Sequence, residues 1–410
     1  MAVDAIFESI TQCRLCAAQD LTEVLNLGNH PPANALVLVG DREPPLIPLR
    51  LMFCQACASI QLGESVDPHF LFSKYVWVTG TSRTAVEYSR RFVVEALKRC
   101  HQKTPFVVEI ASNDGTFLRR FQEGGSRVLG IDPAENLAEV AVACGLPTSV
   151  RFFTKEVAED VLGTHGYADI VVARNLIPHV KEIHSVIHGI ATLLEPTGTG
   201  IIEFHDTTLI LNELQYDYIY HEHLFYYSLA SIGKLLRQYG LAVYDVERSP
   251  ISGGSWVIYF SKASREKTQA LKDAELQELN SGVNSLEHWL GFGAKANDHR
   301  TRLTAIVRGS LGPIVAYGAS ARSSTLVNYC GFGCQDISSI IDKNPLKQGL
   351  LAPGSKIPVI SYVEGEKLLD SQERILLLAW NFGEEVISDL KVSGYQGRFI
   401  IPFPGEPRIQ

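Results

Sequence analysis

The sequence has no apolar run of the roughly 18 residues that a membrane-spanning helix needs. Its first ten residues carry acidic side chains, where a signal peptide would have a basic segment and then an apolar core. An excess of positive charge is also missing, because the formal net charge is -8. We therefore expect a cytoplasmic protein that has neither a membrane nor a nucleic acid as its partner.

The composition is that of an ordinary globular protein, with 46% hydrophobic and 20% charged residues. A chain of 410 residues exceeds what one hydrophobic core usually holds, so we expect two or three domains. We expect a monomer or a weak homo-oligomer.

Four of the eight cysteines form two Cys-x-x-Cys pairs, Cys13 with Cys16 and Cys54 with Cys57. Two such pairs complete a tetrahedral four-sulfur site, which predicts a structural zinc ion. The segment between the pairs is long enough for a small β-rich fold. Two disulfides or two redox-active pairs are the alternatives, which a cytosolic location and the lack of a surrounding β-α-β pattern disfavour.

A strand, a small-residue turn and a second strand follow from residue 106 onward. The pattern predicts a buried strand at 106–110, a turn that opens a helix at 111–118, and a strand at 128–131 that ends in Asp132. This order is typical of the nucleoside-binding half of a doubly wound sheet. The turn lacks the spacing Gly-x-Gly-x-x-Gly, which disfavours a dinucleotide.

Acidic residues flank this turn, and they suit a ligand with positive charge such as S-adenosylmethionine. Further strands are expected at 168–173 and 198–203, with Asn175 and His179 just beyond the first of them. Both of these residues could equally be loop caps. The expected cofactor contacts are Glu109, Ser112, Asn113, Asp114, Gly115, Asp132 and Asn175.

The run from Asp217 to His223 concentrates side chains that exchange protons. If it is extended, Tyr220 and Glu222 share one face while His221 and His223 share the other. The alternative is a polar loop with solvated histidines.

Four motifs occur in a fixed order along the chain. They are the two Cys-x-x-Cys pairs, Tyr75 with the serine-containing loop after it, the run Val108-Glu109-Ile110-Ala111-Ser112-Asn113-Asp114-Gly115, and the run Tyr220-His221-Glu222-His223. In this the sequence resembles the sugar C-methyltransferases, which methylate the carbon next to the ketone of a nucleotide-linked 4-keto-deoxysugar. The resemblance implies an α/β fold with a zinc-binding domain at 1–70, a Rossmann-like methyltransferase domain at 71–262, and a Rossmann-like domain with a helical lead-in at 263–410.

The third part has its own strand and turn pattern, with strands expected at 313–317 and 337–341. The resemblance implies that it helps to hold the nucleotide, which we expect to be that of a dTDP-linked sugar. Backbone amides at the start of the helix after residue 318 could receive a pyrophosphate, and Arg322 could add a charged contact. A relic domain used only for packing is the alternative. The expected substrate contacts are His179, Ser252, Gly318, Ser320, Arg322 and Asp342.

Two positions depart from the family pattern. Ser252 stands where a histidine is usual, and Arg322 replaces a lysine, which binds phosphate with different geometry. These departures leave open the identity of the sugar, of the nucleotide base and of the methylated carbon.

The chemistry needs a base for the proton beside the ketone and a donor for the enolate oxygen. His223 and Tyr220 are the candidates for the base. We expect Glu222 to orient the imidazole or raise its basicity. Either Tyr220 or Tyr75 could donate to the enolate oxygen or exchange a proton with it. A methyltransferase with a non-sugar acceptor and a non-catalytic zinc-stabilised binding protein are the alternatives.

Overall fold

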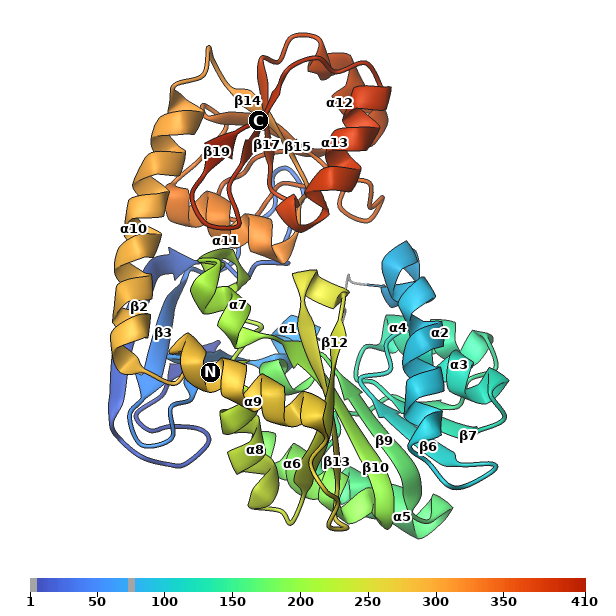
Figure 1. Cartoon of the computed structure of the whole chain (residues 1–410). Helices are drawn as coiled ribbons and strands as arrows, with labels where there is room; N and C mark the ends of the chain where they lie inside the picture. Colours follow the sequence, from blue (N-terminus) through green and yellow to red (C-terminus); the bar gives the residue numbers. More distant parts are fainter. Residues whose placement is uncertain (1–5, 73–77) are drawn as a thin grey trace, which may run out of the picture.

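The computed structural model describes residues 6–72 and 78–410, and for Ser252 it describes the backbone alone. The chain builds sheets of four, seven and six strands and a two-stranded ribbon (Figure 1). No helix within these two stretches is long and apolar enough to cross a membrane.

The N-terminal sheet is antiparallel and has the strand order β11-β4-β3-β2. Its strands are β2 (Leu21–His30), β3 (Ile47–Cys54), β4 (Ile60–Leu62) and β11 (Phe225–Tyr226). β1 (Phe7–Ser9) and β5 (Glu64–Val66) form the ribbon, and α1 (Pro68–Phe72) follows. The expected β-rich segment between the cysteine pairs is therefore present, and its sheet also takes in a strand from the middle of the chain.

The central sheet has the order β12-β13-β10-β9-β6-β7-β8, parallel from β10 to β8 and antiparallel at β13 and β12. Its strands are β6 (Phe106–Ile110), β7 (Arg127–Ile131), β8 (Thr148–Ser149), β9 (Ala168–Arg174), β10 (Leu194–His205), β12 (Ala242–Ser249) and β13 (Ser255–Ser261).

Helices cover both faces of this sheet because its inner strands are apolar on both sides. Successive side chains of β6 point to opposite faces: Val107 shares an apolar cluster with Phe92 and Phe117, and Val108 shares one with Val161 and Ile187. The helices on the first face are α2 (Arg83–Lys98), α3 (Thr116–Glu123) and α4 (Glu135–Ala143). Those on the second are α5 (Lys155–His165), α6 (Ile183–Leu193) and α8 (Leu229–Arg237).

The C-terminal sheet has the order β16-β15-β14-β17-β18-β19 and is parallel except at β19. Its strands are β14 (Ile314–Tyr317), β15 (Ile337–Ile341), β16 (Val359–Ile360), β17 (Arg374–Leu377), β18 (Arg398–Ile401) and β19 (Arg408–Ile409). Its helices are α11 (Ala321–Cys330), α12 (Tyr362–Leu369) and α13 (Gly383–Val392).

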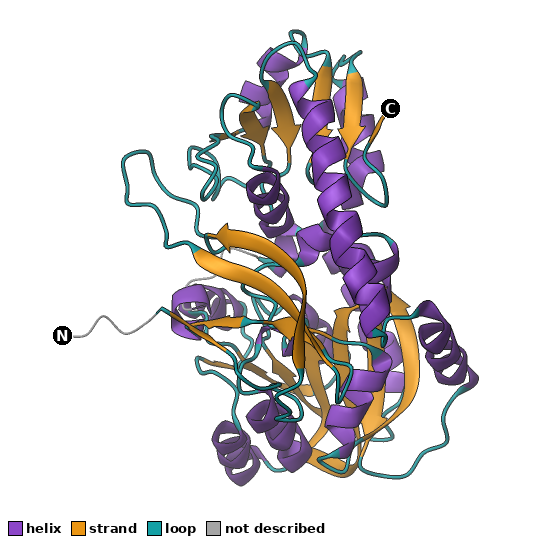
Figure 2. Cartoon of the chain, turned by 90° about the vertical axis from the view of Figure 1, so that its left-hand side faces the viewer, coloured by secondary structure: helices purple, strands orange, loops and turns teal. Residues whose placement is uncertain are grey.

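The expected helical lead-in consists of α9 (Gln269–Ser281) and α10 (Leu286–Arg308). The long helix α10 runs beside β2 and up to the C-terminal sheet, so it links the first and third parts (Figures 1 and 2). Gly293 makes the approach to β2 possible, because a Cβ atom there would lie 2.2 Å from the carbonyl oxygen of Val24.

The parallel sheets of the second and third parts both end near one short segment between β10 and β11. This segment contains α7 (Thr207–Asn212) and η3 (Tyr216–Tyr218). The hydroxyl of Thr325 on α11 donates to the carbonyl of Ile219 at 2.9 Å, which joins the C-terminal part to it. The segment that carries the acid-base residues is therefore enclosed by all three parts of the chain.

The strands expected at 106–110, 128–131, 168–173, 198–203, 313–317 and 337–341 are confirmed by β6, β7, β9, β10, β14 and β15. The extended form considered for the run at 217–223 is wrong. Residues 216–218 form η3, and the amide of His223 donates to the carbonyl of Tyr220 at 2.9 Å, which closes a turn.

Candidate active site

The four predicted zinc ligands come together at the edge of the N-terminal sheet. Their sulfur atoms all lie within 4.8 Å of one another. The Sγ atoms of Cys13 and Cys57 are 3.7 Å apart, and those of Cys16 and Cys54 are 3.6 Å apart. Zinc-sulfur bonds of about 2.3 Å in a tetrahedron place sulfurs roughly 3.8 Å apart, so this set fits a closed structural site.

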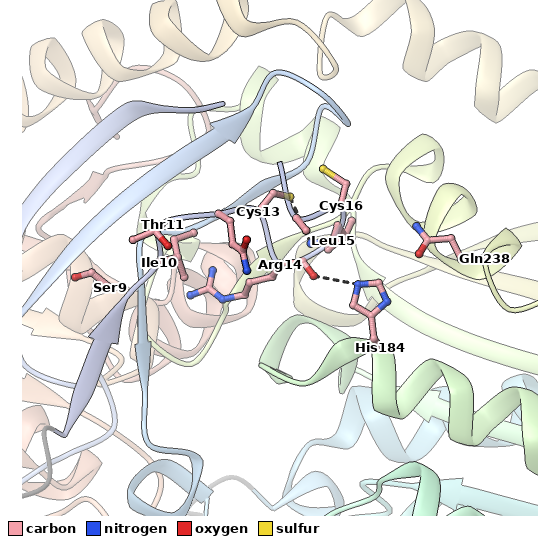
Figure 3. Close-up of a pocket in the computed structure, with 11 residues that line it drawn as sticks. Ser9, Ile10, Thr11, Cys13, Arg14, Leu15, Cys16, His184 and Gln238 are labelled. Atoms are coloured by element: carbon pink, nitrogen blue, oxygen red, sulfur yellow. Dashed lines mark hydrogen bonds between the residues drawn. The ribbon is translucent and has the colours of Figure 1, made fainter. Parts of the chain in front are cut away.

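A surface hollow of about 730 Å³ lies beside this centre (Figure 3). It is lined by Ser9 to Ala17, His184 and Gln238, and the imidazole of His184 contacts the carbonyl of Arg14 at 3.1 Å. None of the predicted catalytic, cofactor or substrate residues that the structure describes lines the hollow, so we do not place the substrate there.

The predicted cofactor turn connects β6 to α3 through a tight backbone path. Ala111, Asn113 and Gly115 have φ values of 56°, 54° and 77°, in the left-handed region. The carboxylate of Asp132 fixes the turn by accepting from the amides of Asn113 at 2.8 Å and Ala134 at 2.9 Å. Asp132 thus holds the backbone that would surround the cofactor.

Two further predicted cofactor residues tie this turn to the segment before α2. The side chain of Asn113 accepts from the amide of Thr79, and that of Asp114 accepts from the amide of Gly80, both at 2.9 Å. Tyr75, the fourth predicted catalytic residue, lies outside the described residues. Residues 79 and 80, a few positions later in the chain, hydrogen-bond to the predicted cofactor turn.

Glu109 and Ser112 supply the buried polar atoms that a cofactor could meet. Among the described residues, Glu109 Oε2 and Ser112 Oγ have no hydrogen-bond partner. Burial raises the pKa of Glu109 to about 8, although the nearby Arg174 acts in the opposite direction. An orphaned buried carboxyl beside a backbone turn fits a ligand with an ammonium group.

Tyr220 and His223 form a direct pair in the turn after η3. Tyr220 Oη lies 2.7 Å from His223 Nε2, and His223 Nδ1 lies 3.1 Å from the carbonyl oxygen of Tyr218. A carbonyl only accepts, so Nδ1 carries the proton and Nε2 accepts from the phenol. The carbonyl of Tyr218 therefore orients the imidazole.

His223 is only 4% exposed and lies among the rings of Tyr218, Tyr220 and His179, whereas Tyr220 is half-buried. Burial lowers the pKa of His223 well below its ordinary value, and the nearby His179 acts in the same direction. The ring of His179 is 4.8 Å from that of His223 and 5.6 Å from that of Phe72. Of the two loop residues predicted after β9, His179 thus lies beside the Tyr220–His223 pair. Asn175 adopts a φ of 49° and donates its amide to the carbonyl of Glu203 at 2.8 Å.

Glu222 faces the N-terminal part. Its Oε1 accepts from the side-chain amide of Asn34 at 2.6 Å. His221 points away from the pair, and its Nε2 lies 3.2 Å from the carbonyl of Pro48. Asn34 was absent from the sequence-based prediction, because a lone asparagine after two prolines carries no motif.

Three predicted substrate residues build the turn at the start of α11. Gly318 has a φ of 99°, and a Cβ atom there would lie 2.4 Å from the Cβ of Ala379. Ser320 caps the helix, with its hydroxyl accepting from the amide of Ser323 at 3.2 Å. Asp342 accepts from the amides of Ala319 and Asn344, both at 2.8 Å.

Lys347 brings a cation to this turn that the sequence-based prediction missed. Its ammonium donates to the carbonyl of Ala319 at 2.7 Å. Burial lowers its pKa, and the carboxylates of Asp342 and Glu222 oppose that shift. Lys347 therefore adds a positive charge to the turn before α11.

The two positions that depart from the family pattern have different surroundings. Ser252 lies in η4 (Ile251–Gly253), within the loop that connects β12 to β13. Arg322, expected to contact phosphate, binds Asp217 with two hydrogen bonds of 2.9 Å.

Comparisons with known proteins match each part of the chain. A zinc-binding domain family matches residues 13–72, a methyltransferase domain family matches 84–246, and the C-methyltransferase C-terminal domain matches 250–404. The C-methyltransferase NovU of Streptomyces niveus is 34% identical over 415 aligned residues, which cover 98% of each chain.

Two further relatives are more distant. The ubiquinone biosynthesis O-methyltransferase of Ralstonia nicotianae is 29% identical over 94 residues, 22% of this chain and 40% of that protein. The magnesium protoporphyrin IX methyltransferase of Synechocystis, solved with bound SAH, has a TM-score of 0.35 and 19% identity over 43% of this chain and 83% of its own. The full-length match to NovU decides the assignment: the chain belongs to the C-methyltransferase family, as an S-adenosylmethionine-dependent enzyme with a zinc-binding N-terminal domain.

Proposed function

We propose that the enzyme methylates the carbon beside the ketone of a nucleotide-linked 4-keto-deoxysugar, in the synthesis of a branched deoxysugar. Membership of the C-methyltransferase family supports a carbon acceptor. The resemblance to the sugar C-methyltransferases in four ordered motifs supports the keto sugar. Carbon methylation beside a ketone requires an enolate. The turn at 217–223, which we call the catalytic turn, offers the acid-base groups for it.

The observation that carries this proposal is the contact between Tyr220 Oη and His223 Nε2 at 2.7 Å. Because His223 is buried behind the half-buried Tyr220, we assign the substrate contact to the phenol oxygen. The substrate proton passes to Tyr220 Oη as the phenol proton passes to His223 Nε2. The C–H electron pair enters the enolate, whose carbon would then bond to the methyl group, with the electron pair of the broken sulfur–methyl bond leaving on S-adenosylhomocysteine.

When bound, S-adenosylmethionine supplies an electrophilic methyl group. In our proposal, Glu109 faces its ammonium group and Asp132 keeps the turn around it closed. His179 lines the sugar site beside His223, at a ring distance of 4.8 Å. Asn34 fixes the carboxylate of Glu222 at the edge of the same site.

We place the nucleotide at the turn before α11. The amides of Ala319, Ser320 and Ser323 are already hydrogen-bonded to the side chains of Asp342, Ser323 and Ser320. A pyrophosphate there would instead meet the ammonium of Lys347, whose charge the neighbouring carboxylates support. This location leaves the sugar between the turn and the catalytic pair.

A panel of nucleotide-linked sugars tests the proposal. The enzyme is incubated with S-adenosylmethionine and 4-keto sugars that differ in base and ring substituents, and products are followed by mass spectrometry and NMR. We expect one added methyl group on the carbon beside the ketone, and none on the matching 4-hydroxy sugars. Methylation of an oxygen, or of a non-sugar carbon acid with every keto sugar untouched, would refute it.

A further inference from the structure

One arginine of the C-terminal part holds the start of the catalytic turn. Arg322 Nε and Nη2 each donate to the carboxylate of Asp217 at 2.9 Å, and Nη2 also reaches Gln215 Oε1 at 3.3 Å. Trp380 Nε1 donates to the same carboxylate at 2.8 Å. Asp217 is 1% exposed and Arg322 is 8% exposed, so this contact is shielded from water.

Aromatic rings fix the guanidinium in this position. It lies 4.6 Å from the ring of Trp380 and 5.2 Å from the ring of Tyr218. A planar guanidinium can stack on rings while its fork binds a carboxylate, which a lysine cannot do. Arg322 thus uses the features that distinguish it from the lysine usual at this position.

Asp217 is connected to the catalytic pair through the next residue, Tyr218. The carbonyl of Tyr218 accepts from His223 Nδ1 at 3.1 Å, and the ring of Tyr218 lies 4.4 Å from that of His223. On its other side, Tyr218 stacks on His205 at 4.1 Å and 27°. A displacement of Asp217 would therefore move the group that fixes the proton on His223.

We propose that Arg322 and Trp380 are positioning residues, through which the C-terminal part sets the geometry of the Tyr220–His223 pair. The charge of Arg322 is already matched by a buried carboxylate, so this role replaces the phosphate contact expected from the sequence. The catalytic consequence rests on the proposed function, whereas the structural consequence does not.

Kinetics of three variants distinguish positioning from phosphate binding. For Arg322→Met and Asp217→Asn we expect kcat to fall about 10- to 100-fold, the cost of a small misplacement, with the KM of the keto-sugar nucleotide nearly unchanged. Arg322→Lys keeps one charged contact and should recover part of kcat. A raised KM with kcat retained in Arg322→Met, and normal rates in Asp217→Asn, would identify a phosphate ligand and overturn the proposal.

Hydrogen exchange tests the positioning without any substrate. The amides of Tyr218, Ile219 and His223 are bonded within the turn, and we expect them to exchange faster in Arg322→Met. If that variant does not fold, Trp380→Phe removes one donor to Asp217 and keeps a ring. Equal protection of these amides in the variant and the wild type would overturn the proposal.

Arg308→Gln is the matched control, because Arg308 also binds an aspartate, Asp336, with hydrogen bonds of 2.9 and 3.3 Å. That pair lies at the amino-terminal ends of β14 and β15, whereas Arg322 follows the carboxyl end of β14, so the loss of the pair should leave the catalytic turn protected. Faster exchange of the turn in Arg308→Gln as well would point to general loosening and also count against the proposal. A wild type that methylates no keto sugar, combined with selective loosening in Arg322→Met, would refute the proposed function alone.

Discussion

Asp342 repeats in the C-terminal sheet the two hydrogen bonds that Asp132 makes in the central sheet. Each carboxylate follows the second strand of its unit, accepts from an amide of the turn after the first strand, and accepts from the amide two residues later. All four distances are 2.8 or 2.9 Å. The two units therefore close the turn after their first strand in the same way, although their sequences show no obvious repeat.

This equivalence predicts separate effects for the two aspartates. Asp132→Asn loses an acceptor for the amide of Asn113, so the affinity for S-adenosylmethionine should fall about tenfold, as expected for one hydrogen bond to a charged group. Asp342→Asn should leave that affinity unchanged and raise the KM of the nucleotide sugar. Calorimetry with the cofactor and steady-state kinetics check both. Equal cofactor affinity in Asp132→Asn and the wild type would contradict the assigned role.

The raised pKa of Glu109 predicts how cofactor binding depends on pH. With a pKa of about 8, its carboxyl is mostly protonated at pH 7, whereas a cationic ligand favours the ionised form. Binding of S-adenosylmethionine should then release protons, and the affinity should weaken by up to about tenfold per pH unit below 8.

Calorimetry in buffers of different ionisation enthalpy measures this release. Glu109→Gln is the control, since it should bind more weakly and lose the pH dependence. The useful range runs from about pH 6 to about pH 8, which is from two units below that pKa up to it. If the affinity of the wild type does not change over this range, Glu109 does not contact the ammonium group.

Zinc removal should affect both stability and catalysis. β4 of the zinc-binding part pairs with β11, which begins two residues after His223, and the amide of Leu62 donates to the carbonyl of Leu224 at 2.9 Å. Chelation should lower Tm by about 5 °C or more, because each kcal/mol lost shifts Tm by roughly 2–4 °C in domains of 150–250 residues. We also expect kcat to fall when β11 loses its partner strand. Unchanged melting of metal-free protein would exclude a structural zinc ion.

Ala111 stores backbone strain at the cofactor turn. Its φ of 56° is costly for alanine and easy for glycine. Ala111→Gly should therefore raise the free energy of unfolding by about 0.5–1 kcal/mol. Ala138→Gly, inside α4, should instead lower it by about 1 kcal/mol or more. Urea denaturation checks both signs, and destabilisation of Ala111→Gly would mean that the alanine methyl contributes more than the strain costs.

Six inner strands of the central and C-terminal sheets could be predicted from the sequence because they are short, apolar and bounded by small residues. The cysteine centre could be predicted for a similar reason, since each pair is set by local spacing and only the meeting of the two pairs depends on the fold. The turn at 217–223 was harder. Its polar and aromatic residues carry no periodicity, so the contact between Tyr220 and His223 depends on a turn that the pattern does not specify.

The contacts between parts of the chain were not predictable. Asn34 meets Glu222, and Arg322 meets Asp217, only because three sheets pack around one segment. The sequence identified Arg322 as a charged residue at a helix start, where a phosphate is the common ligand. It could not indicate that the guanidinium group of Arg322 would bind the buried carboxylate of Asp217, which belongs to another part of the chain.

Deuterium exchange at the carbon beside the ketone tests the central claim most directly. The enzyme, S-adenosylhomocysteine and the keto-sugar nucleotide are combined in deuterated water, so that deprotonation proceeds without methyl transfer. We predict deuterium incorporation by the wild type, and a loss of about 10² to 10⁴ in its rate for both Tyr220→Phe and His223→Gln. Exchange by Tyr220→Phe at the wild-type rate would contradict the account, because the phenol would then not carry the proton.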